Sequence, residues 1–195
     1  MTARPLTVRL TLLAPAMTTA LREARFDDGG PVEAVPAGPL TLPAGVRVVS
    51  SPSGRCLATA EALGLDPASV RAEPALAGCA MGRWRGLRLD ELAAAEPESV
   101  AAWLADPDAA PHGGESLREL RERVAGWLDA LEPGPGPVYG FAEPDVVRAA
   151  VAHALGAPDS AFWRLDVRPL HAVELSGRSG RWNVRVGTPV GASAG

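Results

Sequence analysis

This sequence contains few histidines and cysteines, the residue types that readily act as general bases and nucleophiles at neutral pH. It contains three histidines, His112, His153 and His171, and two cysteines, Cys56 and Cys79. None of them stands at a zinc-ligand spacing, so we predict two free thiols, no metal and no cofactor. All 19 cationic residues are arginine, which excludes lysine Schiff-base chemistry and a P-loop lysine.

Length and composition are those of a globular protein. The chain has 195 residues, 47% of them hydrophobic and 22% charged. Its net charge of −4 gives no basic surplus for binding nucleic acid. Arg9 interrupts the apolar start and no run of 18 apolar residues exists, so neither a signal peptide nor a membrane span is predicted. We expect a cytoplasmic protein with a single domain at 1–188 and a disordered tail at 189–195.

Short strands alternate with helices along the chain. Strands are predicted at 7–13, 46–49 and 138–142, helices at 54–63, 89–95, 98–105, 115–131 and 146–155, and a closing hairpin at 170–186. The helix at 115–131 has the clearest pattern, because its leucines and Val124 recur at spacings of three and four. This alternation predicts a three-layer α/β/α sandwich with a central, mostly parallel sheet.

Four segments, in order, resemble the histidine phosphatase, or phosphoglycerate mutase-like, superfamily. Residues 50–60 (SSPSGRCLATA) resemble its S-S-P-x-x-R-x-x-x-T-A signature, and 76–86 resemble its L-x-E…G-x-W-x-G stretch. Residues 111–116 (PHGGES) resemble the P-x-GES that precedes a long helix, and 162–186 resemble the closing hairpin. The resemblance implies the same sandwich, with a site at the carboxyl ends of its strands.

The resemblance also implies a chemistry. In that family a neutral histidine attacks phosphorus, two arginines and a second histidine hold the phosphoryl oxygens, and an acid protonates the leaving oxygen. The two histidines come from an R-H-G motif after the first strand and an S/T-H-G motif after a later one. Carried onto this sequence, the ligand positions that remain are Arg55, Thr18, Arg25 and Glu115.

The sequence departs from the family at the reactive positions. Ala14-Pro15-Ala16 stands where the family has Arg-His-Gly, so Pro15 occupies the nucleophile position with no side-chain base. Glu143 takes the position of the second histidine, and Gly78 takes that of the acid. Because loss of a covalent nucleophile alone costs about 10⁴–10⁶ in rate, phosphohistidine catalysis is not expected.

Two arrangements are open for Glu143. Its carboxylate either pairs with Arg55 and fills the old phosphate pocket with the protein's own anion, or faces solvent and caps the helix that begins at Pro144. Among the histidines, His171 is the one expected near the pocket, because the family's closing segment passes close to it. His112 and His153 are by default surface or core residues.

Three functions are open at this point. The first is a pseudoenzyme with a binding or regulatory role toward an unknown small molecule or protein. The second is a repurposed enzyme, with Glu143 as acid or base, Arg55 holding a substrate anion, and His171 or His112 assisting. The third is a weak phosphatase of unknown substrate, which would need a histidine that reaches phosphorus. We expect no nucleic-acid or membrane partner, and a homodimer is an assembly that the family often forms.

Overall fold

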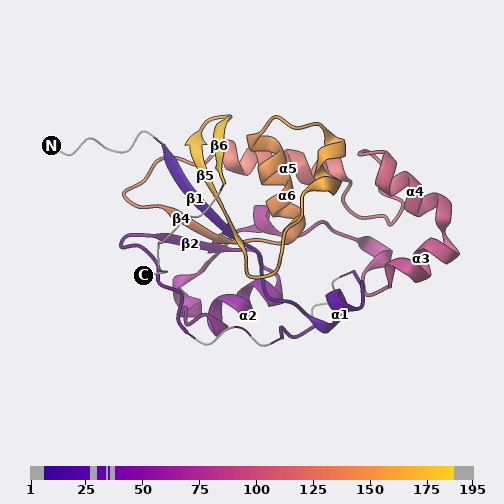
Figure 1. The fold of residues 1–195 in the computed structure, drawn as a ribbon, viewed down its shortest axis with the longest axis horizontal. Coiled ribbons are helices and arrows are strands. Elements are labelled where there is room, and N and C mark those ends of the chain that lie inside the picture. Colours follow the sequence, from indigo (N-terminus) through magenta and orange to yellow (C-terminus); the bar gives the residue numbers. More distant parts are fainter. Residues whose placement is uncertain (1–6, 27–29, 34, 36–37, 187–195) are drawn as a thin grey trace.

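A six-stranded sheet forms the centre of the protein. The computed structural model describes residues 7–26, 30–33, 35 and 38–186 (Figure 1), and the predicted tail at 189–195 lies outside them. The strand order is β3-β2-β4-β1-β5-β6. The strands are β1 (Val8–Leu13), β2 (Arg47–Ser50), β3 (Arg71–Ala72), β4 (Val138–Phe141), β5 (Ala172–Arg178) and β6 (Arg181–Arg185).

The sheet is mostly parallel, as the sequence predicted. β4 pairs in parallel with β1 on one side and β2 on the other, while the β5–β6 hairpin joins β1 in antiparallel fashion. The last residues of β1 and β2, Leu13 and Ser50, both lie opposite Phe141 of β4. The carboxyl ends of three neighbouring strands therefore meet at one edge of the sheet.

Helices cover both faces of this sheet (Figure 1). The helix α2 (Gly54–Ala62) lies on one face, and α5 (Leu117–Asp129) and α6 (Pro144–Ala154) lie on the other. Successive strand residues point to opposite faces. Leu12 accordingly joins the apolar cluster beneath α5 and α6, whereas Leu13 joins the cluster beneath α2. The predicted three-layer sandwich is confirmed.

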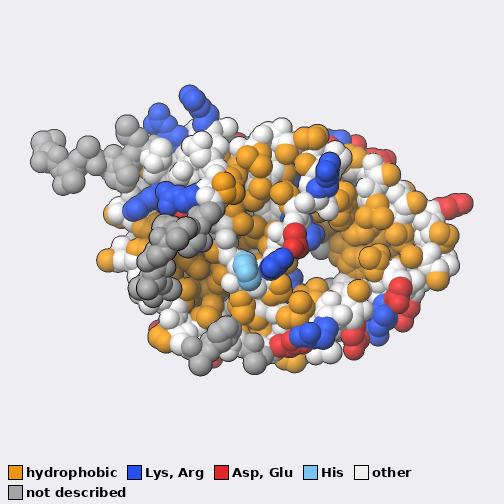
Figure 2. Space-filling model, in the orientation of Figure 1, with side chains coloured by type: hydrophobic (Ala, Val, Ile, Leu, Met, Phe, Trp, Pro, Cys, Tyr) orange, Lys and Arg blue, Asp and Glu red, His pale blue; other side chains and the backbone are white. Residues whose placement is uncertain are grey.

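Two further helices, α3 (Leu89–Ala95) and α4 (Pro97–Ala105), lie beside the sheet around a separate core of Trp84, Leu92 and Val100. The surface is hollowed between these helices and the main body (Figure 2). The four-residue α1 (Thr19–Arg22) and the two-residue β3 were not predicted, because neither is long enough to show a periodic pattern. Within the described ranges, no helix combines the length and hydrophobicity needed to cross a bilayer.

Candidate functional site

The site begins where β2 and β4 end. Ser53 follows β2 and caps α2, as expected from its position: its Oγ accepts a hydrogen bond from the Cys56 N–H at 3.2 Å. The same hydroxyl donates to Oε1 of Glu143 at 2.6 Å. Glu143 follows β4, so the parallel pairing of β2 with β4 brings these two loops together.

The carboxylate of Glu143 lies against the guanidinium of Arg55. Nη2 of Arg55 donates to Oε2 of Glu143, and both side chains are only 5% exposed. Glu143 holds the N-cap position of α6 but makes no capping hydrogen bond with its side chain. The structure thus has the internal ion pair, which is the first of the two arrangements that the sequence left open. A buried carboxylate needs such partners, since an unpaired buried charge is strongly destabilising.

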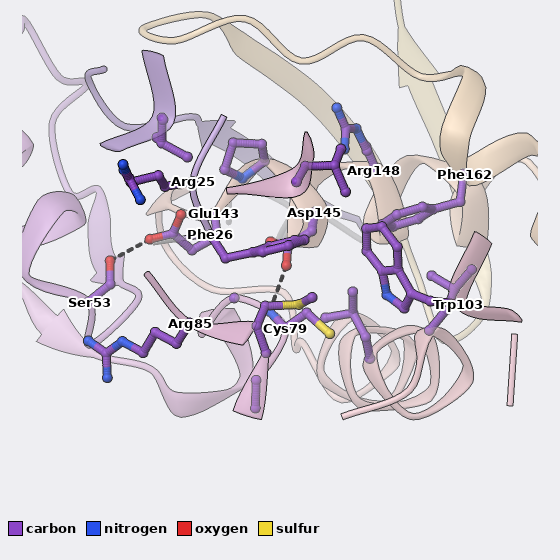
Figure 3. A pocket seen from close by; sticks show the side chains of 18 of the residues that line it. Arg25, Phe26, Ser53, Cys79, Arg85, Trp103, Glu143, Asp145, Arg148 and Phe162 are labelled. Atoms are coloured by element: carbon purple, nitrogen blue, oxygen red, sulfur yellow. Dashed lines mark hydrogen bonds between the residues drawn. The ribbon is translucent and has the colours of Figure 1, made fainter. Parts of the chain in front are cut away.

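A cavity of about 480 Å³ adjoins this ion pair. Its two ends differ in chemistry, as Figure 3 shows. The polar end is lined by Arg25, Ser53, Arg85 and Glu143, and by Arg55 through its pair with Glu143. The aromatic end is lined by Trp103 and Phe162, and by Phe26 and Trp163, whose rings pack against Trp103. Asp145 and Cys79 lie between the two ends. The cavity is therefore suited to a molecule that has both a polar and an apolar part.

Asp145 is a cavity residue that the sequence analysis missed. Its Oδ2 accepts from the Cys79 N–H at 2.6 Å, and its Oδ1 accepts from the Val146 N–H at 2.9 Å. Burial raises the pKa of this carboxyl, although the two hydrogen bonds and the charge of Arg55 act against the rise. One feature of the sequence could have pointed to Asp145: Pro144 at the first helical position places it in the first turn of α6. An acidic residue in a first turn ordinarily stabilises the helix, so its position did not suggest a functional role.

The other predicted ligand residues are divided between the cavity and its surroundings. Arg25 lines the cavity. Thr18 does not, and its Oγ1 instead accepts from the Leu21 N–H at 3.3 Å and caps α1. Glu115 forms two hydrogen bonds of 2.7 Å with Arg123 and also lies outside the cavity lining. The structure therefore brings Arg25, but not Thr18 or Glu115, to the Arg55 pocket.

Pro15, which the sequence resemblance predicted at the nucleophile position, lies directly after β1. It is buried between Ala14 and Ala16, both less than 2% exposed. Ala14 exchanges backbone hydrogen bonds with Leu170 and His171, and the Ala16 N–H donates to Oγ1 of Thr59 at 3.0 Å. This stretch therefore contributes packing and backbone hydrogen bonds, without a reactive group.

The histidines are not among the described residues that line the cavity. His171 is exposed, with Nδ1 2.9 Å from the carbonyl oxygen of Pro169. His112 is buried against Trp84, with ring centroids 5.1 Å apart, and burial lowers its pKa. In the described part of the chain, no three His, Cys, Asp or Glu residues are grouped to hold a metal ion.

Residues 41–187 match the histidine phosphatase superfamily (branch 1). The chain belongs to this superfamily. A glucosyl-3-phosphoglycerate phosphatase of Mycobacterium tuberculosis is 35% identical over 126 residues, which are 62% of this chain and 55% of the relative. The chain thus spans about half the length of that curated relative.

Solved phosphatase structures resemble this chain over most of its length. Mycobacterial glucosyl-3-phosphoglycerate phosphatase in complex with VO3 is 28% identical, with a TM-score of 0.70 and coverage of 94% of this chain and 98% of that one. The α-ribazole phosphatase of Shigella flexneri is 20% identical, with a TM-score of 0.72 and coverage of 92% and 95%. The second likeness concerns the fold alone.

Proposed function

We propose that this histidine phosphatase superfamily protein has lost phosphohistidine catalysis and acts as a binding or regulatory protein through the cavity at its strand ends. The buried ion pair between Arg55 and Glu143 carries this proposal. A phosphate that entered the pocket would meet a guanidinium already satisfied by a carboxylate. It would also meet the negative charge of that carboxylate in a site shielded from water, where like charges repel strongly.

The missing residues add to this effect. Relative to the family pattern, the pocket lacks one arginine and two histidines that contact the phosphoryl group. At about 1.5–3 kcal/mol for each charged hydrogen bond, their loss removes roughly 4–9 kcal/mol of anion affinity. Such a loss corresponds to about three to six orders of magnitude in the dissociation constant. Pro15 moreover offers no atom that could attack phosphorus.

The direct test is turnover of p-nitrophenyl phosphate. We expect the wild-type protein to hydrolyse it no faster than the Arg55→Ala variant does. Hydrolysis by the wild type that disappears in Arg55→Ala would overturn the proposal and identify an ordinary phosphatase.

A complementary test removes the internal anion. In Glu143→Ala, the carboxylate is gone and Arg55 can accept an external anion. We expect inorganic phosphate or vanadate to raise the melting temperature of this variant but not that of the wild type. Glu115→Ala is the matched control, since it removes a carboxylate from an arginine pair outside the cavity. Equal stabilisation of the wild type by phosphate would contradict the proposal.

The raised pKa of Asp145 supports a second candidate, a repurposed enzyme. A cavity carboxyl that keeps its proton nearer to neutral pH can serve as a general acid. In this candidate, Glu143 or Asp145 transfers the proton and Arg55 holds the anionic part of a substrate. Turnover of a non-phosphate compound that is lost in Asp145→Asn or Glu143→Gln would favour this candidate over a purely binding role.

A further inference from the structure

The aromatic end of the cavity is a continuous wall of rings. The ring centroids of Trp103 and Trp163 are 4.8 Å apart, those of Phe162 and Trp163 are 5.0 Å apart, and those of Phe26 and Trp103 are 5.7 Å apart. All four side chains line the cavity, and Figure 3 shows Phe26, Trp103 and Phe162 facing its interior. Such a wall favours a flat apolar body, because rings pack on it in stacked or edge-to-face contacts.

Arg148 of α6 brings a cation to this wall. Its Nε donates to the carbonyl oxygen of Leu165 at 2.8 Å, and its guanidinium carbon lies 5.9 Å from the centre of the Phe162 ring. Among the described residues, no carboxylate lies within ion-pair distance of Arg148. Neither of its two terminal nitrogens donates a hydrogen bond to any described residue. Arg148 lines the same cavity. It can therefore accept a carboxylate in a two-bond, planar arrangement.

We propose that the cavity binds an organic carboxylate with a flat apolar body, the body lying against the wall of Phe26, Trp103, Phe162 and Trp163 and the carboxylate on Arg148. This inference rests on the proposed function, since it assumes that Glu143 occupies Arg55. It assigns the anchor to Arg148 because this arginine lies against the aromatic wall, whereas Arg25 and Arg85 lie at the polar end.

A singly charged anion fits this place better than a phosphate ester. Asp145 precedes Arg148 by three residues on α6, so the two side chains share one face of the helix. A dianion on Arg148 would be repelled by the Asp145 carboxylate, and a single guanidinium balances only one charge.

Three probes with one ring system test this preference: 2-naphthoate, 2-naphthol and 2-naphthyl phosphate. We expect 2-naphthoate to bind the wild-type protein at least about tenfold more tightly than either of the others in calorimetric titrations. Equal binding of 2-naphthol would show that the charge contributes nothing, and no binding of 2-naphthoate would overturn the inference. Neither result affects the proposed loss of catalysis.

Variants locate the anchor. Arg148→Gln should weaken the binding of 2-naphthoate at least about tenfold. Arg148→Lys keeps the charge without the planar guanidinium, so its affinity for 2-naphthoate should lie between those of Arg148→Gln and the wild type. Arg164→Gln is the control, because Arg164 is exposed and outside the cavity lining, next to Trp163. An equal loss in Arg164→Gln would overturn the assignment. If Arg148→Gln does not fold, the comparison of the three probes on the wild type still decides.

The probes also separate the two proposals. Tighter binding of 2-naphthyl phosphate than of 2-naphthoate, abolished in Arg55→Ala, would contradict both, because it would show an open phosphate site at Arg55. Failure of 2-naphthoate alone, with no phosphate binding and no hydrolysis, would contradict only the ligand class.

Discussion

Gly78 lies directly against the side chain of Glu143. A β-carbon placed on Gly78 would be 3.1 Å from Cγ and 3.3 Å from Cβ of Glu143. The resemblance drawn from the sequence places Gly78 at the position of an acid and Glu143 at that of a histidine, and so implies a carboxylate gained on one side of this contact and one lost on the other. The absence of a side chain at Gly78 leaves the space that Glu143 occupies.

Gly78→Ala tests this contact. Because Glu143 is held by both Arg55 and Ser53, it cannot move aside freely, and we expect the added methyl group to lower the free energy of unfolding by about 1–3 kcal/mol. Gly126→Ala is the matched control. Gly126 lies inside α5 with no neighbouring atom within 4 Å of the added carbon, so alanine should stabilise the helix by about 0.5–1 kcal/mol. Urea unfolding of both variants measures the difference, and a neutral Gly78→Ala would argue against a tight contact.

Removing one partner of the Arg55–Glu143 ion pair should lower the free energy of unfolding much more than replacing both partners by apolar residues. Glu143→Gln removes the buried carboxylate that pairs with Arg55, so we expect a loss of about 3–5 kcal/mol in unfolding free energy. For a chain of this size, that loss lowers the melting temperature by roughly 6–20 °C. The double variant Arg55→Met/Glu143→Leu removes both charges and should recover most of the stability. A double variant that is less stable than Glu143→Gln would show that the pair is worth more than its desolvation cost.

The elements that rest on local patterns were predictable from the sequence. The apolar repeat on α5 identified that helix, and its start moved from 115 to 117 because Ser116 and Glu119 form a capping box there. Strands β1 and β4 followed from short apolar runs, and the mostly parallel sheet followed from the alternation of strands with helices. What these elements share is that residues near one another in sequence determine them.

The contacts that define the site were not predictable in the same way. Whether Glu143 capped α6 or met Arg55 depended on how closely α2 and α6 approach, which no local pattern encodes. The aromatic wall joins Phe26, Trp103 and Trp163, which are far apart in the chain. Asp145 acquires its raised pKa only through burial in the folded protein, which outweighs the opposing hydrogen bond from the Cys79 N–H. Long-range packing, rather than residue type, assembled this end of the cavity.

Both thiols should be unreactive in the folded protein. Burial raises the pKa of Cys56 to about 11 and that of Cys79 to about 12, so almost no thiolate exists at neutral pH. We expect neither cysteine to react with a disulfide reagent such as DTNB within minutes at about pH 7.5, and both to react after denaturation in guanidinium chloride. Rapid modification of Cys79 in the native protein would indicate that the cavity opens far more than the structure implies.

The Asp129 carboxylate should make the free energy of unfolding depend on pH. Its Oδ1 accepts a hydrogen bond from the Gly180 N–H at 2.8 Å and another from Nε1 of Trp182 at 3.1 Å. Burial alone would raise the pKa of Asp129, but hydrogen bonds with His153 and Trp182 outweigh it and hold the pKa below its usual value near 4. A lowered folded-state pKa gives stability that is present at neutral pH and is lost as the pH falls through that value. Since the side chain is 37% exposed, we expect Asp129→Asn to cost only about 1–2 kcal/mol at neutral pH, with the gap to the wild type closing below about pH 4.

Thermal unfolding between neutral and acidic pH measures this gap in stability between Asp129→Asn and the wild type. Asp166→Asn, a change at a largely exposed ion pair, is the control. A gap that stays constant down to acidic pH would show that the Asp129 carboxylate contributes through its shape and not through its charge.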